Sequence, residues 1–159
     1  VTATLIGSAG TVSTEWLDHP STEGTLSVEL AFPFFDDSTP AAKEYQDFLK
    51  RHDLGDAGGG NATFAYLGAK LFEAAMENVG DGVTTPEAVK KGLYALKDET
   101  LGGLVPQPLT FDEDAATPIR CWFLIAIEDG KFVTPQGLKT ECAPQEFVDK
   151  AIAELDSGS

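Results

Sequence analysis

The side chains that could carry out chemistry are few and scattered along this sequence. The only two histidines are His19 and His52, and no C-x-x-C motif accompanies them, so no zinc-binding spacing is present. Asp36 and Asp37 are adjacent, and neighbouring side chains tend to point apart, which makes them poor partners in acid–base catalysis. No nucleophile elbow or Ser/His/Asp pattern is recognisable. The sequence therefore disfavours an enzyme, and it predicts neither a metal nor a cofactor.

Two glycine-rich stretches could bring backbone N–H groups close to a ligand. The first, Gly7-Ser8-Ala9-Gly10, follows a predicted short strand over residues 2–6, and such a turn can present its amides to a bound molecule. A plain turn without a ligand is the alternative there. The second stretch, residues 55–61, lacks the Lys and Ser/Thr of a phosphate-binding loop, so nucleotide binding is not predicted.

The two cysteines, Cys121 and Cys142, lie on either side of a predicted hairpin. An even count is compatible with one disulfide in an oxidising compartment. Two buried thiols are the alternative that the sequence leaves open.

Charge and composition limit the classes of partner. The chain has 159 residues, 26 acidic against 11 basic, and a formal net charge of -15. Nucleic acid and anionic membrane surfaces would be repelled by this charge and are poor partners. The apolar fraction of 42% indicates a folded protein, and no apolar run approaches the roughly 20 residues that span a bilayer. Because the first residue is Val, the chain looks like a processed or excised piece.

The elements alternate between strands and helices, which predicts an α/β fold. Apolar residues recur at steps of three and four from Phe64 to Val79, the spacing of a core helix, with Asn61 as its predicted N-cap and Gly80 at its end. Further helices are predicted after Thr39-Pro40, after Thr85-Pro86 and over residues 145–155. Strands are predicted over residues 25–32 and 121–127, and Asp129-Gly130 predicts a hairpin back to residues 131–134.

The order of these pieces resembles the C-terminal half of the type 1 periplasmic solute-binding proteins of ABC importers, the branched-chain amino acid (Leu/Ile/Val) binding family. The likeness extends over residues 3–142 and rests on the order and spacing of several short motifs. These are Gly7–Gly10, Glu23–Ser27, Thr39–Ala41, Phe64–Leu67, Glu73–Met76, Leu101–Leu104, Pro108–Phe111 and Asp129–Val133.

The resemblance implies two Rossmann-like lobes with a ligand cleft between them, present here as a C-terminal fragment. Residues 1–33 and 118–159 are expected in the C-terminal lobe, and residues 34–117 in the N-terminal lobe. The implied partners are a small-molecule ligand, the membrane subunits of an ABC importer and the N-terminal half of the same protein. The implied location is extracytoplasmic, in the periplasm or on a cell-surface lipoprotein, and the pairing of Cys121 with Cys142 fits that compartment.

The resemblance also suggests which residues contact the ligand, and these expected contacts are Ser8, Ala9, Gly10, Asn61, Phe64 and Tyr66. In amino-acid-binding relatives the turn carries an acidic residue that pairs with the ligand's ammonium group, and Ala9 occupies the matching position. Without that carboxylate an ammonium group of the ligand would be left unpaired, which counts against a zwitterionic amino acid, and the expected ligand is amino-acid-like or another small organic molecule. The alternatives are a cytoplasmic ligand-sensing regulator with the same fold and an unrecognised enzyme.

Overall fold

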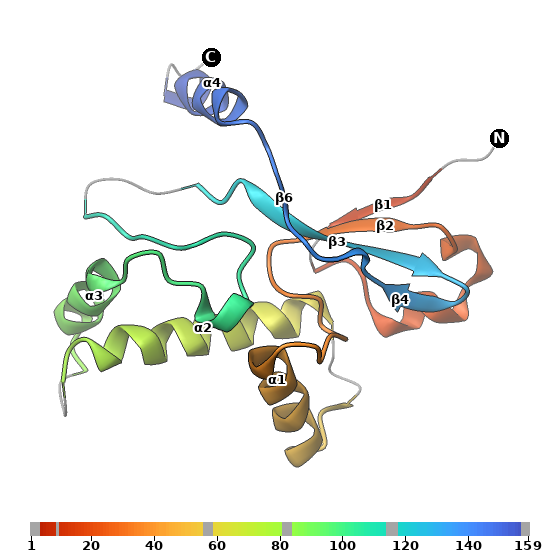
Figure 1. The fold of residues 1–159 in the computed structure, drawn as a ribbon, viewed down its shortest axis with the longest axis horizontal. Coiled ribbons are helices and arrows are strands. Elements are labelled where there is room, and N and C mark those ends of the chain that lie inside the picture. The colour runs from red at the N-terminus through yellow and green to blue at the C-terminus, as the bar shows by residue number, and fades with distance from the viewer. Residues whose placement is uncertain (1–3, 9, 56–58, 81–83, 114–117, 157–159) are drawn as a thin grey trace.

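The computed structural model describes residues 4–8, 10–55, 59–80, 84–113 and 118–156, so the predicted contact at Ala9 lies outside the described residues. A sheet and a group of three helices lie side by side, and the C-terminal helix stands away from both (Figure 1). This mixed α/β arrangement is the fold class that the sequence predicts.

The sheet is organised around β3 (Cys121–Glu128), the eight-residue strand that the sequence predicts most clearly. Its other strands are β1 (Ile6–Ser8), β2 (Leu26–Glu29), β4 (Lys131–Val133) and β6 (Glu141–Cys142), and β5 (Pro135–Leu138) follows β4. The strand order is β1-β2-β3-β4, with β6 pairing along the other part of β3. β1 runs parallel to β2, and the remaining pairs are antiparallel. No residue of β3 before Glu128 is exposed, as expected of a strand covered on both faces.

The turn between β3 and β4 confirms the predicted Asp-Gly hairpin. Asp129 and Gly130 have φ angles of 52° and 66°, the left-handed conformation that this tight turn requires. The Glu23 carboxylate accepts hydrogen bonds from both turn amides, at 2.8 Å and 3.1 Å. A residue 106 positions earlier in the chain therefore fixes the end of the hairpin.

The helices are α1 (Pro40–Arg51), α2 (Gly60–Glu77), α3 (Pro86–Ala95) and α4 (Gln145–Asp156), with short 3-10 turns η1 (Thr14–Asp18), η2 (Pro20–Thr22) and η4 (Leu101–Gly103). The predicted starts of α1 and α3 are confirmed. Thr39 Oγ1 accepts a hydrogen bond from Ala42 N at 3.1 Å, and Thr85 Oγ1 accepts one from Ala88 N at 3.2 Å. A proline follows each of these threonines, at the position where its missing N–H does no harm.

An aromatic cluster holds α1 and α2 against the segment after β2, and we call this cluster the helical core. Phe32 and Tyr45 meet edge to face with ring centroids 5.1 Å apart, and the Tyr66 ring lies 5.0 Å from that of Tyr45. The buried members of the helical core are Ala31, Phe32, Ala42, Tyr45, Leu49, Leu67, Leu101, Leu104 and Phe123.

The packing of α2 differs in part from the expected single core face. Leu67 and Ala75 are buried as predicted, whereas the side chains of Phe64 and Phe72 are 38% and 48% exposed. The reason is that α2 is apolar on more than one side, so helical periodicity alone does not identify the side that the described chain covers.

A second apolar cluster, the sheet core, lies against the sheet. It consists of Val12, Phe34 and Ile125, with Trp16, Phe35 and Phe132 packed around them. β3 contributes to both clusters, because Phe123 belongs to the helical core and Ile125 to the sheet core. The central strand therefore connects the two parts of the molecule.

A disulfide joins Cys121 to Cys142, as the sequence predicts for an oxidising compartment. The two residues are directly opposite in the β3–β6 pairing, so the bond secures the short strand that leads to α4. The predicted helix near the C-terminus is confirmed as α4, but it does not close onto a core. Phe147 and Leu155 are 66% and 80% exposed there.

Candidate functional site

The turn that follows β1 is held together by one threonine. Thr11 N donates to the carbonyl oxygen of Ser8 at 3.0 Å, and the Thr11 hydroxyl donates to the same oxygen at 2.7 Å. In return, Thr11 Oγ1 accepts a hydrogen bond from Ser8 N at 3.1 Å. Gly10 lies inside this turn with a φ of 85°, a conformation that glycine adopts without strain.

The start of α2 lies against this turn. The backbone of Ser13 forms an antiparallel bridge with Gly59, and Asn61 Nδ2 donates to the Gly10 carbonyl oxygen at 3.3 Å. Gly10 and Asn61 are 51 residues apart in sequence, so folding brings together two of the predicted contact residues. We call this place the junction: Ser8, Gly10 and Thr11 of the turn together with residues 59–61.

The prediction that Asn61 caps α2 is wrong. The helix begins at Gly60 with Gly59 as its N-cap, and no side chain caps it. Asn61 is therefore in the first helical turn, where its amide reaches across to Gly10 instead. No described residue accepts a hydrogen bond from the N–H groups of Gly60 and Asn61. Within the described ranges, two of the amides that a helix leaves unsatisfied at its start therefore have no acceptor, and Gly60 itself is buried.

The backbones at the junction approach so closely that side chains would not fit. A Cβ atom on Gly60 would lie 2.7 Å from Gly10 N, and one on Gly10 would lie 2.6 Å from Asn61 Oδ1. Glycine at these two positions therefore lets the turn and the helix start come into direct contact.

A buried carboxylate, Glu29, lies beneath these glycines at the end of β2. Its side chain is 2% exposed, and Glu29 Oε2 lies 3.2 Å from the point that a Cβ on Gly60 would occupy. Glu29 Oε1 accepts a hydrogen bond from the Ser27 hydroxyl at 2.8 Å. Burial raises the pKa of the Glu29 carboxyl above its usual value, and the hydrogen bond from Ser27 opposes this effect.

Sequence reasoning missed Glu29, although a signal for it exists. Thr25, Ser27 and Glu29 alternate along the predicted strand, so their side chains share one face of β2. All three are 2% exposed, which makes this a buried polar face. An acid on the same strand face as two small hydroxyl residues was the clue.

The two predicted aromatic contacts, Phe64 and Tyr66, lie on different sides of α2. Phe64 is one turn from Asn61 and is 38% exposed. The Tyr66 ring packs in the helical core against Phe32, Tyr45 and Phe48. The structure therefore brings Gly10 and Asn61 into contact near Ser8, keeps Phe64 on the open side of the helix and places Tyr66 between the helices.

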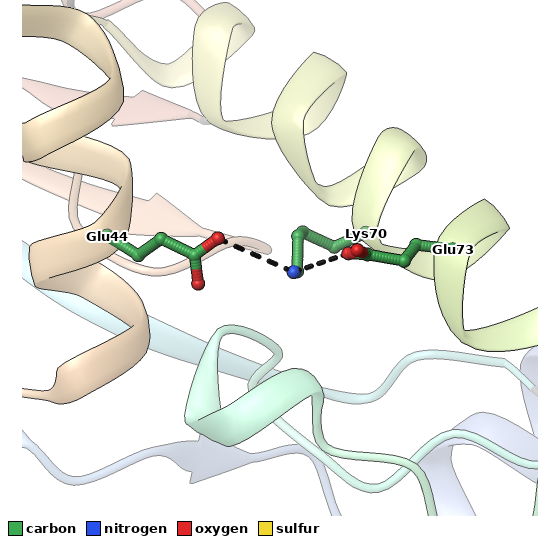
Figure 2. Close-up of polar contacts among 3 residues, drawn as sticks. All are labelled: Glu44, Lys70 and Glu73. Atoms are coloured by element: carbon green, nitrogen blue, oxygen red, sulfur yellow. Dashed lines mark hydrogen bonds and ion pairs between the residues drawn. The ribbon is translucent and has the colours of Figure 1, made fainter. Parts of the chain in front are cut away.

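A polar cluster between α1 and α2 offers a different kind of chemistry (Figure 2). Lys70 Nζ lies 3.6 Å from Glu44 Oε1 and also forms an ion pair with Glu73. The hydrogen bond to Glu73 raises the pKa of Lys70, so its amine is protonated at neutral pH and cannot act as a nucleophile. The cluster therefore ties α1 to α2 and does not form a reactive centre.

Metal binding and membrane insertion find no support in the described ranges. Within them, no three His, Cys, Asp or Glu side chains are grouped closely enough to bind a metal ion. Among the described helices, none combines the length and the apolar character needed to cross a bilayer.

Residues 3–131 match the sequence model of the periplasmic binding proteins, a stretch that includes β1, β2, β3 and the whole junction. The chain belongs to the periplasmic binding protein family. No curated protein matches the chain over its sequence.

Solved structures show the same type 1 fold. The substrate-binding protein of an ABC transporter from Aeropyrum pernix superposes with a TM-score of 0.71 at 16% identity, over 91% of this chain. A candidate branched-chain amino acid ABC transporter from Rhodospirillum rubrum gives a TM-score of 0.57 at 18% identity, over 84% of this chain. An extracellular ligand-binding receptor from Rhodopseudomonas palustris gives 0.56 at 16% identity, over 83%.

These matches involve only part of each solved structure. The chain spans 39%, 37% and 40% of the length of the Aeropyrum, Rhodospirillum and Rhodopseudomonas proteins, respectively. It therefore represents a fragment of the type 1 periplasmic-binding-protein fold.

Proposed function

We propose that this chain is part of an extracytoplasmic solute-binding receptor of an ABC importer. The receptor would hold a small amino-acid-like or other small organic ligand in a cleft between two lobes. The observation that carries this proposal is the hydrogen bond from Asn61 Nδ2 to the Gly10 carbonyl oxygen. It places a strand end and a helix start side by side, which is where α/β proteins bind small molecules.

The two lobes would consist of residues 1–33 with 118–159, and of residues 34–117. This division rests on the family resemblance, because each apolar cluster contains residues of both proposed lobes: Phe34 lies in the sheet core, and Phe123 lies in the helical core. In this arrangement the chain crosses between the lobes after β2 and again before β3. Hinge closure at these crossings would report ligand binding to the transporter.

The proposed ligand contacts combine backbone groups of the turn, one side-chain amide and two aromatic side chains that would line the cleft. They are Ser8, Ala9, Gly10, Asn61, Phe64 and Tyr66. The N–H groups of Gly60 and Asn61, which have no acceptor among the described residues, support this set, because they can donate to an anionic or carbonyl oxygen of a ligand. The half-exposed ring of Phe64, one turn further along α2, is suited to an apolar part of the same ligand.

The proposed partner that completes the cleft is the N-terminal half of the same protein. Leu5 and Ile6, beside and on the open edge strand β1, are 46% and 78% exposed, and Phe64 and Phe72 form an apolar face on α2. Open strand edges and apolar helix faces are positions that a folded protein normally covers. The chain spans 39% of the length of the solved Aeropyrum protein, so we expect the rest of the same receptor to cover these surfaces.

The disulfide favours a receptor over a cytoplasmic regulator with the same fold. Structural disulfides persist in oxidising compartments and are rare in the cytosol. We therefore assign the protein to the periplasm or the outer cell surface, where the membrane subunits of an importer would meet it. The binding proteins of the matched family also make a binding role the better proposal than catalysis.

Thermal-shift screening of the protein at its full native length tests the proposed function. The panel consists of amino acids, amides, ureas and aromatic acids. A ligand present at about 100 times its Kd adds about 2.7 kcal/mol of stability, so at least one class should raise the Tm by several degrees. If no class raises the Tm, the protein is not a receptor for small organic solutes.

A matched pair of variants links any shift to the junction. Asn61→Ala removes the amide at the start of α2 and should reduce the ligand-induced shift. Asn78→Ala removes an amide at the other end of the same helix, where Asn78 Nδ2 donates to the Ala74 carbonyl oxygen. This second variant should leave the shift unchanged, and equal losses in both variants would argue against a site at the junction.

A further inference from the structure

The chain passes between the sheet and the group of three helices in two places (Figure 1). It leaves β2 and reaches α1 through residues 30–39, the first crossing, and it leaves η4 and returns to β3 through residues 104–120, the second crossing. Residues 114–117 of the second crossing lie outside the described ranges. Any movement of the sheet relative to the helices must bend or twist these two segments, so the contacts that hold them determine where the movement pivots.

The side chain of Gln107 joins the two ends of the second crossing. Gln107 Oε1 accepts hydrogen bonds from Arg120 N at 2.8 Å and from Cys121 N at 3.2 Å. Gln107 Nε2 donates to the Pro118 carbonyl oxygen at 3.2 Å. We call these three hydrogen bonds the clasp. The clasp connects residues up to 14 positions apart and fixes the first residue of β3 against the segment that follows η4.

Prolines on both sides of Gln107 stiffen the backbone that carries it. Pro106 and Pro108 have a fixed φ angle, and each restricts the residue before it to extended conformations. Pro106 is buried and Gln107 is half-buried, so this short segment is also packed against the rest of the protein. Less conformational freedom is therefore lost when the clasp forms than in a flexible loop.

The first crossing lies against the same segment. Phe32 N donates to the Leu104 carbonyl oxygen at 3.0 Å, and both side chains are buried in the helical core. Gln46 Nε2 of α1 donates to the Phe34 carbonyl oxygen at 2.7 Å, which holds the first crossing to the helices. The two crossings therefore meet at residues 104–107.

The start of β3, which the clasp holds, is also bonded on its other side. Ala143 N donates to the Arg120 carbonyl oxygen at 2.8 Å, and Arg120 Nη1 donates to the Ala143 carbonyl oxygen at 2.8 Å. The disulfide from Cys121 to Cys142 adds a covalent link. Because of these bonds the start of β3 resists sliding, and bending is favoured where the two crossings meet.

We propose that Gln107 is a positioning residue of the hinge. Its clasp holds the start of β3 against residues 104–107, so that the sheet and the helices rotate relative to each other about this point. The inference rests on the proposed receptor function, in which this rotation opens and closes the cleft. Without the clasp, the second crossing is longer and looser, and the sheet and the helices take a wider range of relative positions.

Distance measurements by pulsed electron paramagnetic resonance, on the protein at its full native length and without added solute, test the proposal. Spin labels are attached at Lys50→Cys of α1 and Lys131→Cys of β4, two exposed positions in the helices and the sheet. Both native cysteines are in the disulfide and do not take up label. The protein with Gln107 intact should give a narrow distance distribution, and Gln107→Ala should broaden it about twofold or more.

A second clasp variant and two controls separate positioning from lost stability. Gln107→Glu keeps the acceptor oxygens but cannot donate to Pro118, and it should also broaden the distribution. Thr85→Ala removes the side-chain cap of α3, so it should lower the Tm without changing the distribution. Gln145→Ala removes an amide that donates to Asp149 within α4 and should leave the distribution unchanged.

Two results would overturn the proposal. One is a distribution as narrow in both Gln107 variants as in the protein with Gln107 intact. The other is equal broadening in Thr85→Ala, because the width would then follow stability and not the clasp.

The failure of this inference is distinguishable from the failure of the receptor function, because the labels report without a solute. If the Gln107 variants leave the width unchanged while solutes of the thermal-shift panel raise the Tm, the role of Gln107 is refuted and the receptor function stands. If the Gln107 variants broaden the distribution but no solute of the panel raises the Tm, the receptor function fails and the positioning by Gln107 stands.

Discussion

The helical core and the junction lie close together but are built on opposite principles. The helical core is apolar and aromatic, with Phe32 and Tyr45 in edge-to-face contact and 2% and 1% exposed. The junction instead combines glycine backbones, N–H groups that have no acceptor in the described ranges, and the buried acid Glu29. Close packing of apolar rings stabilises a fold. Both regions also contain polar groups without a partner in the described ranges, namely the Tyr45 and Tyr66 hydroxyls in the helical core and the first N–H groups of α2 at the junction.

The largest expected effect comes from breaking the helical core. Phe32→Ala removes a ring that is 2% exposed and should lower the free energy of unfolding by about 3–5 kcal/mol. Phe147→Ala is the matched control, because Phe147 of α4 is 66% exposed and its loss should change stability by less than about 1 kcal/mol. Denaturant unfolding followed by circular dichroism gives both values. Similar losses for the two rings would contradict this description of the core.

The next effect tests the strand that connects the two regions. Replacing Cys121 and Cys142 with alanine opens a loop with a sequence separation of 21 residues. The chain-entropy estimate for a loop of this length gives a loss of about 3 kcal/mol. Denaturant unfolding with and without a reductant measures the same quantity in the wild-type protein. If the reductant does not change the free energy of unfolding, the disulfide does not restrain the sheet.

Two glycine substitutions, at Gly92 and Gly68, test whether α3 packs tightly against α2. A Cβ on Gly92 of α3 would lie 2.2 Å from the Ala75 carbonyl oxygen of α2, so Gly92→Ala should cost about 1–3 kcal/mol. A Cβ on Gly68 of α2 would meet no described neighbour within 4 Å, and Gly68→Ala should add up to about 1 kcal/mol through helix propensity. Thermal unfolding of the two variants provides the measurement. Changes of the same sign would contradict the contact between α2 and α3.

The smallest expected effect concerns the junction and depends on pH. Burial raises the pKa of Glu29 above its usual value of 4.5, so the folded state prefers the protonated acid. The unfolding free energy of the wild type should therefore fall, relative to that of Glu29→Gln, as the pH rises through the raised pKa. Each pH unit by which the folded-state pKa of Glu29 exceeds its unfolded-state pKa corresponds to about 1.4 kcal/mol of unfolding free energy. Unfolding at a series of pH values from about 4 to 8 measures it, and parallel pH curves for the two proteins would contradict the burial of this acid.

Local signals in the sequence were sufficient for much of the fold. The threonine and proline at the start of α1, the apolar run of β3 and the Asp-Gly turn each determine their structure within a few residues. The start of α2 was misplaced because Asn61, a good capping residue, finds its partner 51 residues away at Gly10. A long-range contact of this kind leaves no local pattern.

The candidate site was less predictable for the same reason. Ala9 stands where relatives have an acid, and that argued against a ligand with an ammonium group. The fold instead places Glu29, from a different strand, beneath the neighbouring glycines. An acid in a short strand normally indicates a solvent-facing position, and its burial depends on α2 and the turn meeting above it.

The measurement that tests the central claim most directly is an NMR titration of isotope-labelled protein at its full native length with the ligand class identified by thermal shift. The amide signals of Gly10, Gly60 and Asn61 should shift on binding, while that of Gly92, at the contact of α2 with α3, stays in place. Shifts centred on Gly92 or elsewhere in the helical group, with the three junction amides unmoved, would contradict a ligand site at the junction.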